Sequence, residues 1–346
     1  MAVKRINLAL QGGGAHGAFT WGVLDRILDE EDIEIAGITG TSAGALNGAA
    51  LKSGLLAGGR AGAKENLAWL WQQVGAVGDM RMAHWIYGLA GPGTEILSRV
   101  MANPLSYSMM DTASRLVSPY YYGPFYRHPL ARVVDQFDFG RVCDQQGPRF
   151  FVCATNVRTG KPRIFTRDEI TTDAILASAC LPTVFQAVEI EDPKTGRKEV
   201  YWDGGYTGNP SLFPLFDPEL PDDIVIVNIN PMERDSVPVT PQDIHNRINE
   251  VSFNSPLLRD LRAIAFVKRL LADGRIERGT MKDTLIHMIA DDDLMQKLDA
   301  SSKLMPNPVL LRSMRDAGHA AADRFLTEHK GALNHSSSVD IVQMFS

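Results

Sequence analysis

The chain has 346 residues, of which 45% are hydrophobic, enough to form a sizeable core in one large domain or two. Its 35 basic and 41 acidic residues give a net charge of −6, and the absence of a basic stripe argues against nucleic-acid binding. The three cysteines, Cys143, Cys153 and Cys180, fit neither a metal-binding spacing nor a disulfide framework, and favour a reducing compartment.

The apolar stretch in the N-terminal segment MAVKRINLALQGGG is too short for a signal peptide, and no cleavage site follows it. No run of about 18 apolar residues is available to cross a membrane. We therefore expect a cytoplasmic protein and leave open a peripheral contact with a membrane or lipid surface. Nothing in the sequence fixes the oligomeric state.

The first elements alternate between strand and helix. Residues 6–10 and 33–40 are apolar runs typical of buried strands, and apolar residues at helical spacing follow each of them. Helices are predicted at 45–56, where small residues permit close packing on a sheet, and at 66–74. A β-α-β-α beginning predicts a parallel sheet covered by helices.

Residues 75–128 differ in composition from the rest. They contain six of the eight tyrosines and five of the thirteen methionines, and Gly, Pro and Ser interrupt them throughout. No periodicity dominates. We interpret this segment as an insertion of short helices and loops over one end of the sheet.

Regular patterns return after this insertion. Strand pairs are expected in two hairpins, and a β-branched run follows them. The expected elements are hairpins at 149–166 and 186–205, a helix at 171–185 ended by Pro182, strands at 222–231 and 284–290, a long helix at 241–274 bent at Pro256, a helix at 308–329, and a loose Ser-rich tail at 335–346. These elements predict an α/β fold with a mostly parallel central sheet and helices on both faces.

The pentapeptide GTSAG at residues 40–44 lies between a predicted strand and a predicted helix. Gly40 and Gly44 flank Ser42, which indicates a turn too tight for side chains. A Gly-x-Ser-x-Gly turn of this kind presents the serine Oγ as a nucleophile. The alternative is an ordinary strand-to-helix loop.

The glycine loop GGGAHG at residues 12–17 matches Gly-x-Gly-x-x-Gly, a pattern of dinucleotide-binding turns. That reading requires an acidic residue at the end of the second strand, where this chain has Thr41 and Ser42. The alternative use of such a loop is an oxyanion hole, in which free backbone N–H groups receive the charge of a reacting carbonyl. Both turns follow adjacent parallel strands, so they meet at one edge of the sheet.

A serine nucleophile needs a base. None of the histidines that follow Ser42 has a suggestive setting, whereas Asp203 in YWDGGY follows a strand and precedes Gly204 and Gly205. An Asx-turn would explain the same pattern.

With these motifs in order, the sequence resembles the patatin-like phospholipases over roughly residues 5–231. That family carries a glycine-rich loop, a Gly-x-Ser-x-Gly turn and a later Asp-Gly-Gly, which here are residues 12–17, 40–44 and 203–205. The segment ASACLPTVF (177–185) is similar to a further family motif. Residues 232–334 are then expected as a C-terminal helical extension packed on the catalytic domain, and 335–346 as a flexible tail.

The resemblance implies a Ser–Asp dyad without histidine, in which Ser42 is the nucleophile and Asp203 the base. It places the oxyanion hole at Gly12, Gly13 and Gly14, and gives Gly17 a supporting role. One position departs from the family, since many relatives have arginine or lysine where this chain has His16. His16 is then expected either to charge below neutral pH or to act only as a hydrogen-bond donor.

The resemblance also implies a lipid acyl hydrolase, of phospholipase A, lysophospholipase or esterase type, that needs no metal or cofactor. The alternatives are an intracellular polyester depolymerase with the same dyad and a non-catalytic lipid-binding regulatory module. We expect the aromatic and methionine-rich insertion to line the acyl-chain route. The candidate groove residues are Trp85, Tyr87, Met109, Met110, Tyr120, Tyr121 and Tyr122.

Overall fold

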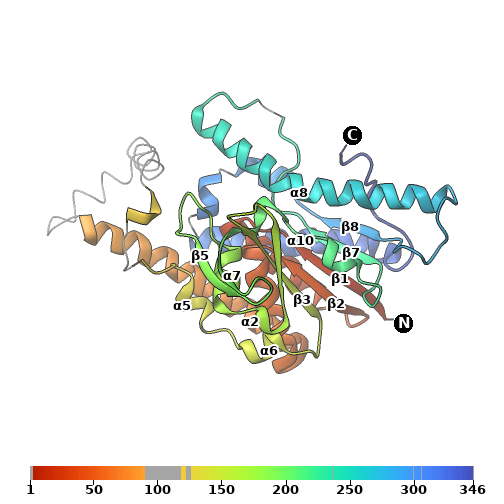
Figure 1. The fold of residues 1–346 in the computed structure, drawn as a ribbon, viewed down its shortest axis with the longest axis horizontal. Coiled ribbons are helices and arrows are strands. Elements are labelled where there is room, and N and C mark those ends of the chain that lie inside the picture. The colour runs from red at the N-terminus through yellow and green to blue at the C-terminus, as the bar shows by residue number, and fades with distance from the viewer. Residues whose placement is uncertain are drawn as a thin grey trace.

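The computed structural model describes residues 3–89, 118–121, 126–235, 237–298, 300–304 and 306–345. Within these residues, one eight-stranded sheet has the order β5-β6-β3-β2-β1-β7-β8, and β4 pairs with β3 beside this path. The strands are β1 (Lys4–Leu10), β2 (Ile33–Gly40), β3 (Arg149–Asn156), β4 (Pro162–Thr166), β5 (Val188–Asp192), β6 (Arg197–Asp203), β7 (Asp223–Val227) and β8 (Leu285–Ile289). Figure 1 shows this sheet at the centre of the molecule.

The middle of the sheet is parallel. Strands β3, β2, β1, β7 and β8 all pair in the same direction. The two predicted hairpins add the antiparallel pairs β3–β4 and β5–β6, and β6 also pairs antiparallel with β3. The predicted α/β fold with a mostly parallel sheet is confirmed.

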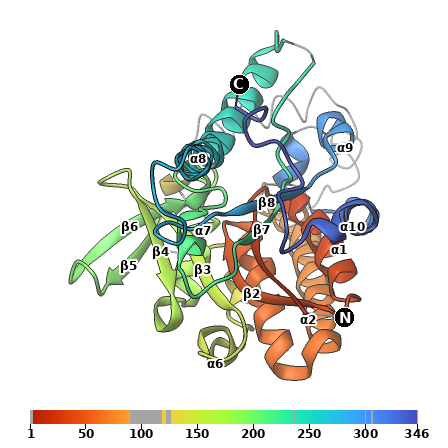
Figure 2. The ribbon, with the colours of Figure 1, turned by 90° about the vertical axis from the view of Figure 1, so that its right-hand side faces the viewer.

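Helices cover both faces of the sheet. Figure 2 shows α1, α2 and α10 on one side and α8 on the other. The α-helices are α1 (Ala18–Ile27), α2 (Ala43–Leu89), α5 (Ala131–Val134), α6 (Phe139–Cys143), α7 (Thr172–Ser178), α8 (Pro241–Ala272), α9 (Asp292–Lys297) and α10 (Pro308–His329). The 3-10 helices are η1 (Gly14–Gly17), η3 (Arg167–Glu169), η4 (Gly204–Tyr206), η5 (Phe213–Phe216), η6 (Ala300–Leu304) and η7 (Lys330–Ala332).

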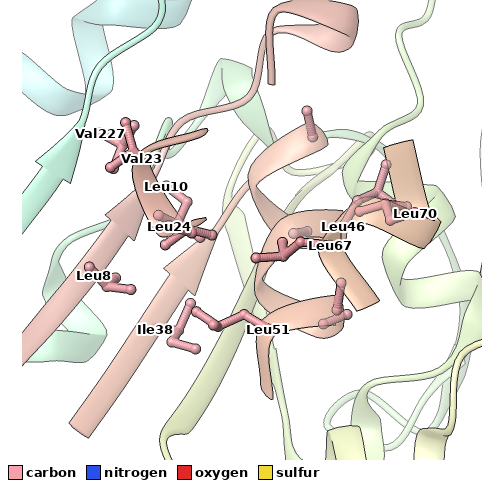
Figure 3. Packing of buried hydrophobic residues seen from close by; sticks show 14 of the residues in the cluster. Leu8, Leu10, Val23, Leu24, Ile38, Leu46, Leu51, Leu67, Leu70 and Val227 are labelled. Carbon is pink, nitrogen blue, oxygen red and sulfur yellow. The ribbon is translucent and has the colours of Figure 1, made fainter. Parts of the chain in front are cut away.

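Alternation along the strands divides the core into two clusters. Leu8 and Leu10 of β1 point toward α1 and α2, where they join Ile38 and Leu51 (Figure 3). Ala9, between them, points to the other face and joins the cluster that α8 covers. Successive side chains of a strand face opposite sides of a sheet, so the central strands are apolar throughout because both faces are buried.

Helix α2 unites the two helices predicted at 45–56 and 66–74. Its backbone leaves helical geometry at Gly58 and Gly59, where Gly59 has φ +62°, so α2 consists of two arms joined at a bend. The second arm continues to Leu89, well past the predicted end at residue 74. The first part of the predicted insertion is therefore helical, whereas residues 90–117 and 122–125 lie outside the described part of the chain.

One predicted helix end differs from expectation. Helix α7 ends at Ser178 rather than at Pro182, because the chain turns at Cys180, whose carbonyl accepts a hydrogen bond from the Asp203 N–H at 2.8 Å. The C-terminal tail contacts β8 where the structure describes it. Ser337 and Ser338 hydrogen-bond the backbone of Ile286 in β8 at 3.1 Å, and Ile341 is buried.

Helix α10 packs directly against α1 through two glycines. A Cβ on Gly22 would lie 1.8 Å from the carbonyl oxygen of Arg315, and a Cβ on Gly318 would lie 1.9 Å from that of Phe19. No side chain fits at such a separation, so the backbones of the two helices touch. The C-terminal helix is thereby fixed to the helix that follows the glycine loop.

We predict that Gly318→Ala lowers the free energy of unfolding by about 3 kcal/mol, because the added methyl group forces α10 away from α1. Chemical denaturation measures the change. Gly331→Ala is the matched control, since a Cβ at Gly331 meets nothing within 4 Å. Equal stability of the two variants would show that α10 and α1 do not pack in this way.

Candidate active site

The three predicted turns meet at one edge of the sheet. The glycine loop follows β1, and Ser42 follows β2, the parallel neighbour of β1. Asp203 ends β6 and pairs with Ala154 near the carboxyl end of β3. The glycine loop touches the serine turn directly, because a Cβ on Gly12 would lie 2.8 Å from the Cβ of Ser42.

The turn at Ser42 is a strained elbow. Ser42 has φ +54°, a left-handed conformation that non-glycine residues rarely adopt. The Gly44 N–H donates to the Thr41 carbonyl at 2.8 Å, and α2 begins at once with Ala43. A Cβ on Gly44 would lie 2.1 Å from the Leu10 carbonyl oxygen, so only glycine lets the elbow lie against the end of β1.

Ser178 holds this elbow from the other side. The Ser42 N–H donates to the Ser178 Oγ at 2.9 Å, and that hydroxyl donates to the Cys153 carbonyl at 2.6 Å. Ser178 lies in the ASACLPTVF segment that the sequence analysis noted without a role for its serine. Because its hydroxyl bonds the backbone N–H of Ser42, Ser178 positions the elbow without engaging the Ser42 hydroxyl.

Asp203 is buried at the end of β6, with 1% of its surface exposed. Its Oδ1 accepts a hydrogen bond from the Gly205 N–H at 2.8 Å, which caps η4. Its backbone is fixed as well, since the Thr155 hydroxyl donates to the Asp203 carbonyl at 2.8 Å. A Cβ on Gly204 would lie 2.1 Å from the Cys153 carbonyl oxygen, which explains the glycine that follows the aspartate.

Burial raises the pKa of the Asp203 carboxyl group to about 7, although hydrogen bonds from the Gly205 N–H and the Ser42 hydroxyl act to lower it. Among the described residues, nothing forms a hydrogen bond of ordinary geometry with Oδ2. The contact with Ser42 is therefore looser than a full hydrogen bond, as is common in catalytic sites without substrate. The site pairs a half-satisfied, unusually basic carboxylate with a serine on a strained turn.

The glycine loop is held by three polar side chains. The Gly12 N–H donates to the Asn209 Oδ1 at 2.7 Å, and the Gly12 carbonyl accepts from the Asn230 Nδ2 at 2.8 Å. Gln11 contributes its Oε1, which accepts from the Ile229 N–H at 2.8 Å. The Gly12 N–H is therefore already bonded within the protein in this structure.

The backbone N–H groups of Gly13 and Gly14 differ from that of Gly12. In the described part of the chain, no acceptor is bonded to either N–H, and η1 begins at Gly14 and runs directly into α1. The first N–H groups of a helix have no intrahelical partner and carry partial positive charge. Gly14 has φ +59°, which turns the chain from β1 into this helix.

A distant segment covers the loop. A Cβ on Gly14 would lie 2.2 Å from the carbonyl oxygen of Lys303 in η6. The Lys303 Nζ donates to the Asn230 Oδ1 at 2.7 Å, and the Ser302 Oγ lies 2.7 Å from the His16 Nε2. Sequence reasoning missed Lys303 because it is almost 290 residues from the loop along the chain and has no motif around it.

His16 is neutral in this setting. Burial, and then the positive charge of Lys303, lower the pKa of His16 to about 3. Of the two expected roles of His16, the structure favours hydrogen bonding, here with Ser302, over a charge near neutral pH. Burial lowers the pKa of Lys303 only to about 8, so Lys303 supplies the positive charge beside the glycine loop.

None of the histidines that the structure describes is hydrogen-bonded to Ser42 or Asp203. His287 does lie between a serine and an aspartate, with Nε2 2.9 Å from the Asp223 Oδ1 and Nδ1 3.1 Å from the Ser338 Oγ. Asp223 begins β7, however, so this set lies at the opposite end of the strands from Ser42. It anchors the C-terminal tail to β7 and β8.

The predicted groove residues are only partly described. Met109, Met110, Tyr122 and the side chains of Trp85 and Tyr87 lie outside the described residues. Tyr120 and Tyr121 are exposed, and the Tyr120 hydroxyl accepts from the Ala187 N–H at 3.2 Å. The segment 118–121 thus lies next to the turn whose Cys180 carbonyl binds the Asp203 N–H.

The described residues contain no helix with the length and apolar character to cross a bilayer. They also contain no group of three or more His, Cys, Asp or Glu side chains placed to hold a metal ion.

Comparison with solved structures gives distant likenesses. The crystal structure of VipD from Legionella pneumophila is 13% identical, with 94% of this chain and 67% of that chain covered and a TM-score of 0.42. The ExoU–SpcU complex of the type III secretion system of Pseudomonas aeruginosa is 16% identical, with 99% and 75% covered and a TM-score of 0.30. A search of curated proteins found no match.

The family comparison is more extensive. The model of the patatin-like phospholipases matches residues 8–216, which is more than half of the chain and includes the glycine loop, the Ser42 elbow and the Asp203 turn. The chain therefore belongs to the patatin-like phospholipase family of lipid ester hydrolases.

Proposed function

We propose that the chain hydrolyses acyl esters of lipids through a dyad of Ser42 and Asp203. The observation that carries this proposal is the pairing of a serine at φ +54° with a buried carboxyl group whose pKa is raised to about 7. An ordinary carboxylate is a poor base for an alcohol. Burial without full hydrogen bonding makes Asp203 a stronger base at neutral pH.

In the acylation step, the Ser42 Oγ forms a bond to the ester carbonyl carbon while Asp203 takes its proton. The carbonyl oxygen becomes an oxyanion, and the N–H groups of Gly13 and Gly14 are the donors that receive it. The bond to the alcohol then breaks, and Asp203 returns the proton to the leaving oxygen. The product is an acyl ester of Ser42.

Water completes the cycle. It attacks the acyl carbon while Asp203 accepts one of its protons, and the second oxyanion faces the same two N–H groups. The bond to Ser42 breaks, the serine regains its proton from Asp203, and a carboxylic acid leaves. Every proton is accounted for by one carboxyl group, so no histidine is needed.

The positive charge of Lys303 supports a lipid with an anionic head group, such as a phospholipid, as the substrate. The acyl chain would follow the surface near Tyr120 and Tyr121, beside the Asp203 turn. The intact elbow and base favour catalysis over a non-catalytic lipid-binding module. A panel of phospholipids, lysolipids, acylglycerols and polyester granules, with Ser42→Ala as blank, separates the phospholipase from the polyester depolymerase.

We predict that Ser42→Ala and Asp203→Asn each lower kcat for a p-nitrophenyl ester by at least about 10³-fold, with little further loss in the double variant, since the two groups act as a unit. His287→Gln is the control, because it changes a buried polar group remote from Ser42. It should keep kcat within about threefold per folded molecule. Turnover close to wild type in either dyad variant would refute the dyad.

Activity should depend on the ionisation of Asp203. Since the base acts when deprotonated, kcat/KM should rise as pH increases through about 7 and level off above it. Fatty-acid release measured by chromatography is the suitable readout, because the colour of p-nitrophenol itself changes with pH. A profile that stays flat between about pH 5 and about pH 8 would contradict the assignment of Asp203 as the base.

Stability should change in the opposite direction. A folded-state pKa raised from 3.8 to about 7 means that the stability contribution of Asp203 is present at low pH and is lost as pH rises through this interval. Asp203→Asn removes the buried charge and should raise the free energy of unfolding at pH 8 by about 1–3 kcal/mol, with a smaller gain at low pH. Urea denaturation at both pH values tests this; a gain that is equal at both would exclude ionisation as its cause.

A further inference from the structure

The outer face of α8 carries a continuous stripe of exposed side chains. Its members are spaced three or four residues apart, so they line one side of the helix. We call them the outer stripe of α8; they are Ile244, Ile248, Val251, Ser255, Arg259, Arg262, Phe266 and Arg269. All eight are exposed, and none is acidic.

The N-terminal end of this stripe is apolar. Ile248 is 57% exposed, and Ile244 and Val251 lie beside it on the same face. Val237 and Val239, just before the helix, are more exposed still, at 84% and 81%. The inner face of α8 is the one that packs on the sheet, where Leu257 and the neighbouring apolar residues are buried. The N-terminal half of α8 therefore exposes apolar side chains that its packing on the sheet does not use.

The C-terminal end of the stripe is basic. Among the described residues, no carboxylate forms an ion pair with Arg259, Arg262 or Arg269. Two of these guanidinium groups rest on aromatic rings instead, Arg262 on Phe345 and Arg269 on Phe266. Three unpaired cations on one line are notable in a chain of net charge −6.

The helix that carries the stripe also contacts the candidate active site on its other side. On the inner side of α8, Phe253 packs against Tyr206 with ring centroids 5.0 Å apart, and a Cβ on Gly205 would lie 2.1 Å from its ring. Gly205 binds the Asp203 carboxyl group, so the inner side of α8 contacts the turn that carries the base. Figure 1 shows the N-terminal half of α8 continuing beyond the sheet.

We propose that the outer stripe of α8 docks this protein on an anionic lipid surface, with the apolar end inserted and the arginines against the head groups. A helix face on which isoleucine and valine stand beside arginines, with no acidic side chain on that face, is typical of an interfacial helix. Charge complementarity selects a negatively charged bilayer over a zwitterionic one. The inference rests on the proposed function, since docking would hold lipid esters near Ser42.

The test uses the full chain carrying Ser42→Ala, so that binding is measured without hydrolysis. Sedimentation with phosphatidylcholine vesicles, with and without phosphatidylglycerol, gives the partition coefficients. We expect binding that requires phosphatidylglycerol, that weakens about fivefold for each arginine replaced by alanine, and that Ile248→Asp combined with Val251→Asp abolishes. The matched controls are Val309→Asp and Arg312→Ala on α10, which exchange exposed residues of the same types and should leave binding unchanged.

Two results would overturn the inference. One is equal binding by the stripe variants and the α10 controls. The other is a change from oligomer to monomer in Ile248→Asp, measured by light scattering, which would make the stripe an interface between copies or with a protein. A separate assay distinguishes failure of the proposed function. With Ser42 intact, the stripe variants should hydrolyse a short monomeric ester normally while losing activity on phosphatidylglycerol vesicles. A wild-type chain that hydrolyses neither substrate would instead refute the proposed function.

Discussion

The Asp203 carboxyl group is buried with no cation beside it among the described residues, and the arrangement of the site depends on this burial. A carboxylate in that position is unfavourable unless something offsets the lost hydration. Within the described part of the chain, the carboxyl group has one strong hydrogen bond, from the Gly205 N–H, and its Oδ2 has no ordinary partner. The resulting rise in the pKa of Asp203 is the property on which the proposed dyad depends.

The positive charge of the site is kept apart from that carboxylate. Lys303 contacts Asn230 and the backbone of Gly14, whereas the Asp203 carboxyl group is bonded to Gly205. A cation next to Asp203 would lower its pKa and weaken it as a base. A cation beyond the loop can instead attract an anionic substrate without that effect. The neutral state of His16 is part of the same division, because it adds no second charge to a crowded region.

The sequence was sufficient for the features that are local. Gly40, Gly44, Gly204 and Gly205 mark turns that only glycine permits, and apolar runs with β-branched residues mark the central strands, so the fold and the position of the elbow could be predicted. The remaining features depend on contacts between distant segments. Asn209 occupying the Gly12 N–H, Lys303 over Gly14 and Ser178 behind Ser42 are all ordinary polar residues until the chain folds. The length of α2 was missed because its second arm has no marked periodicity.

The packing of α10 against α1 and the position of β7 have a consequence for what constitutes a cooperative unit. The family match ends at residue 216, but β7 lies between β1 and β8 inside the sheet, and Gly318 of α10 touches the backbone of α1. A fragment ending at the family boundary would leave β1 as an open edge with unpaired backbone groups, and would uncover one side of α1. The glycine loop is supported by both elements, so its geometry is a property of the long-range fold rather than of the family segment alone. Catalytic competence and the global fold should consequently be lost in one transition.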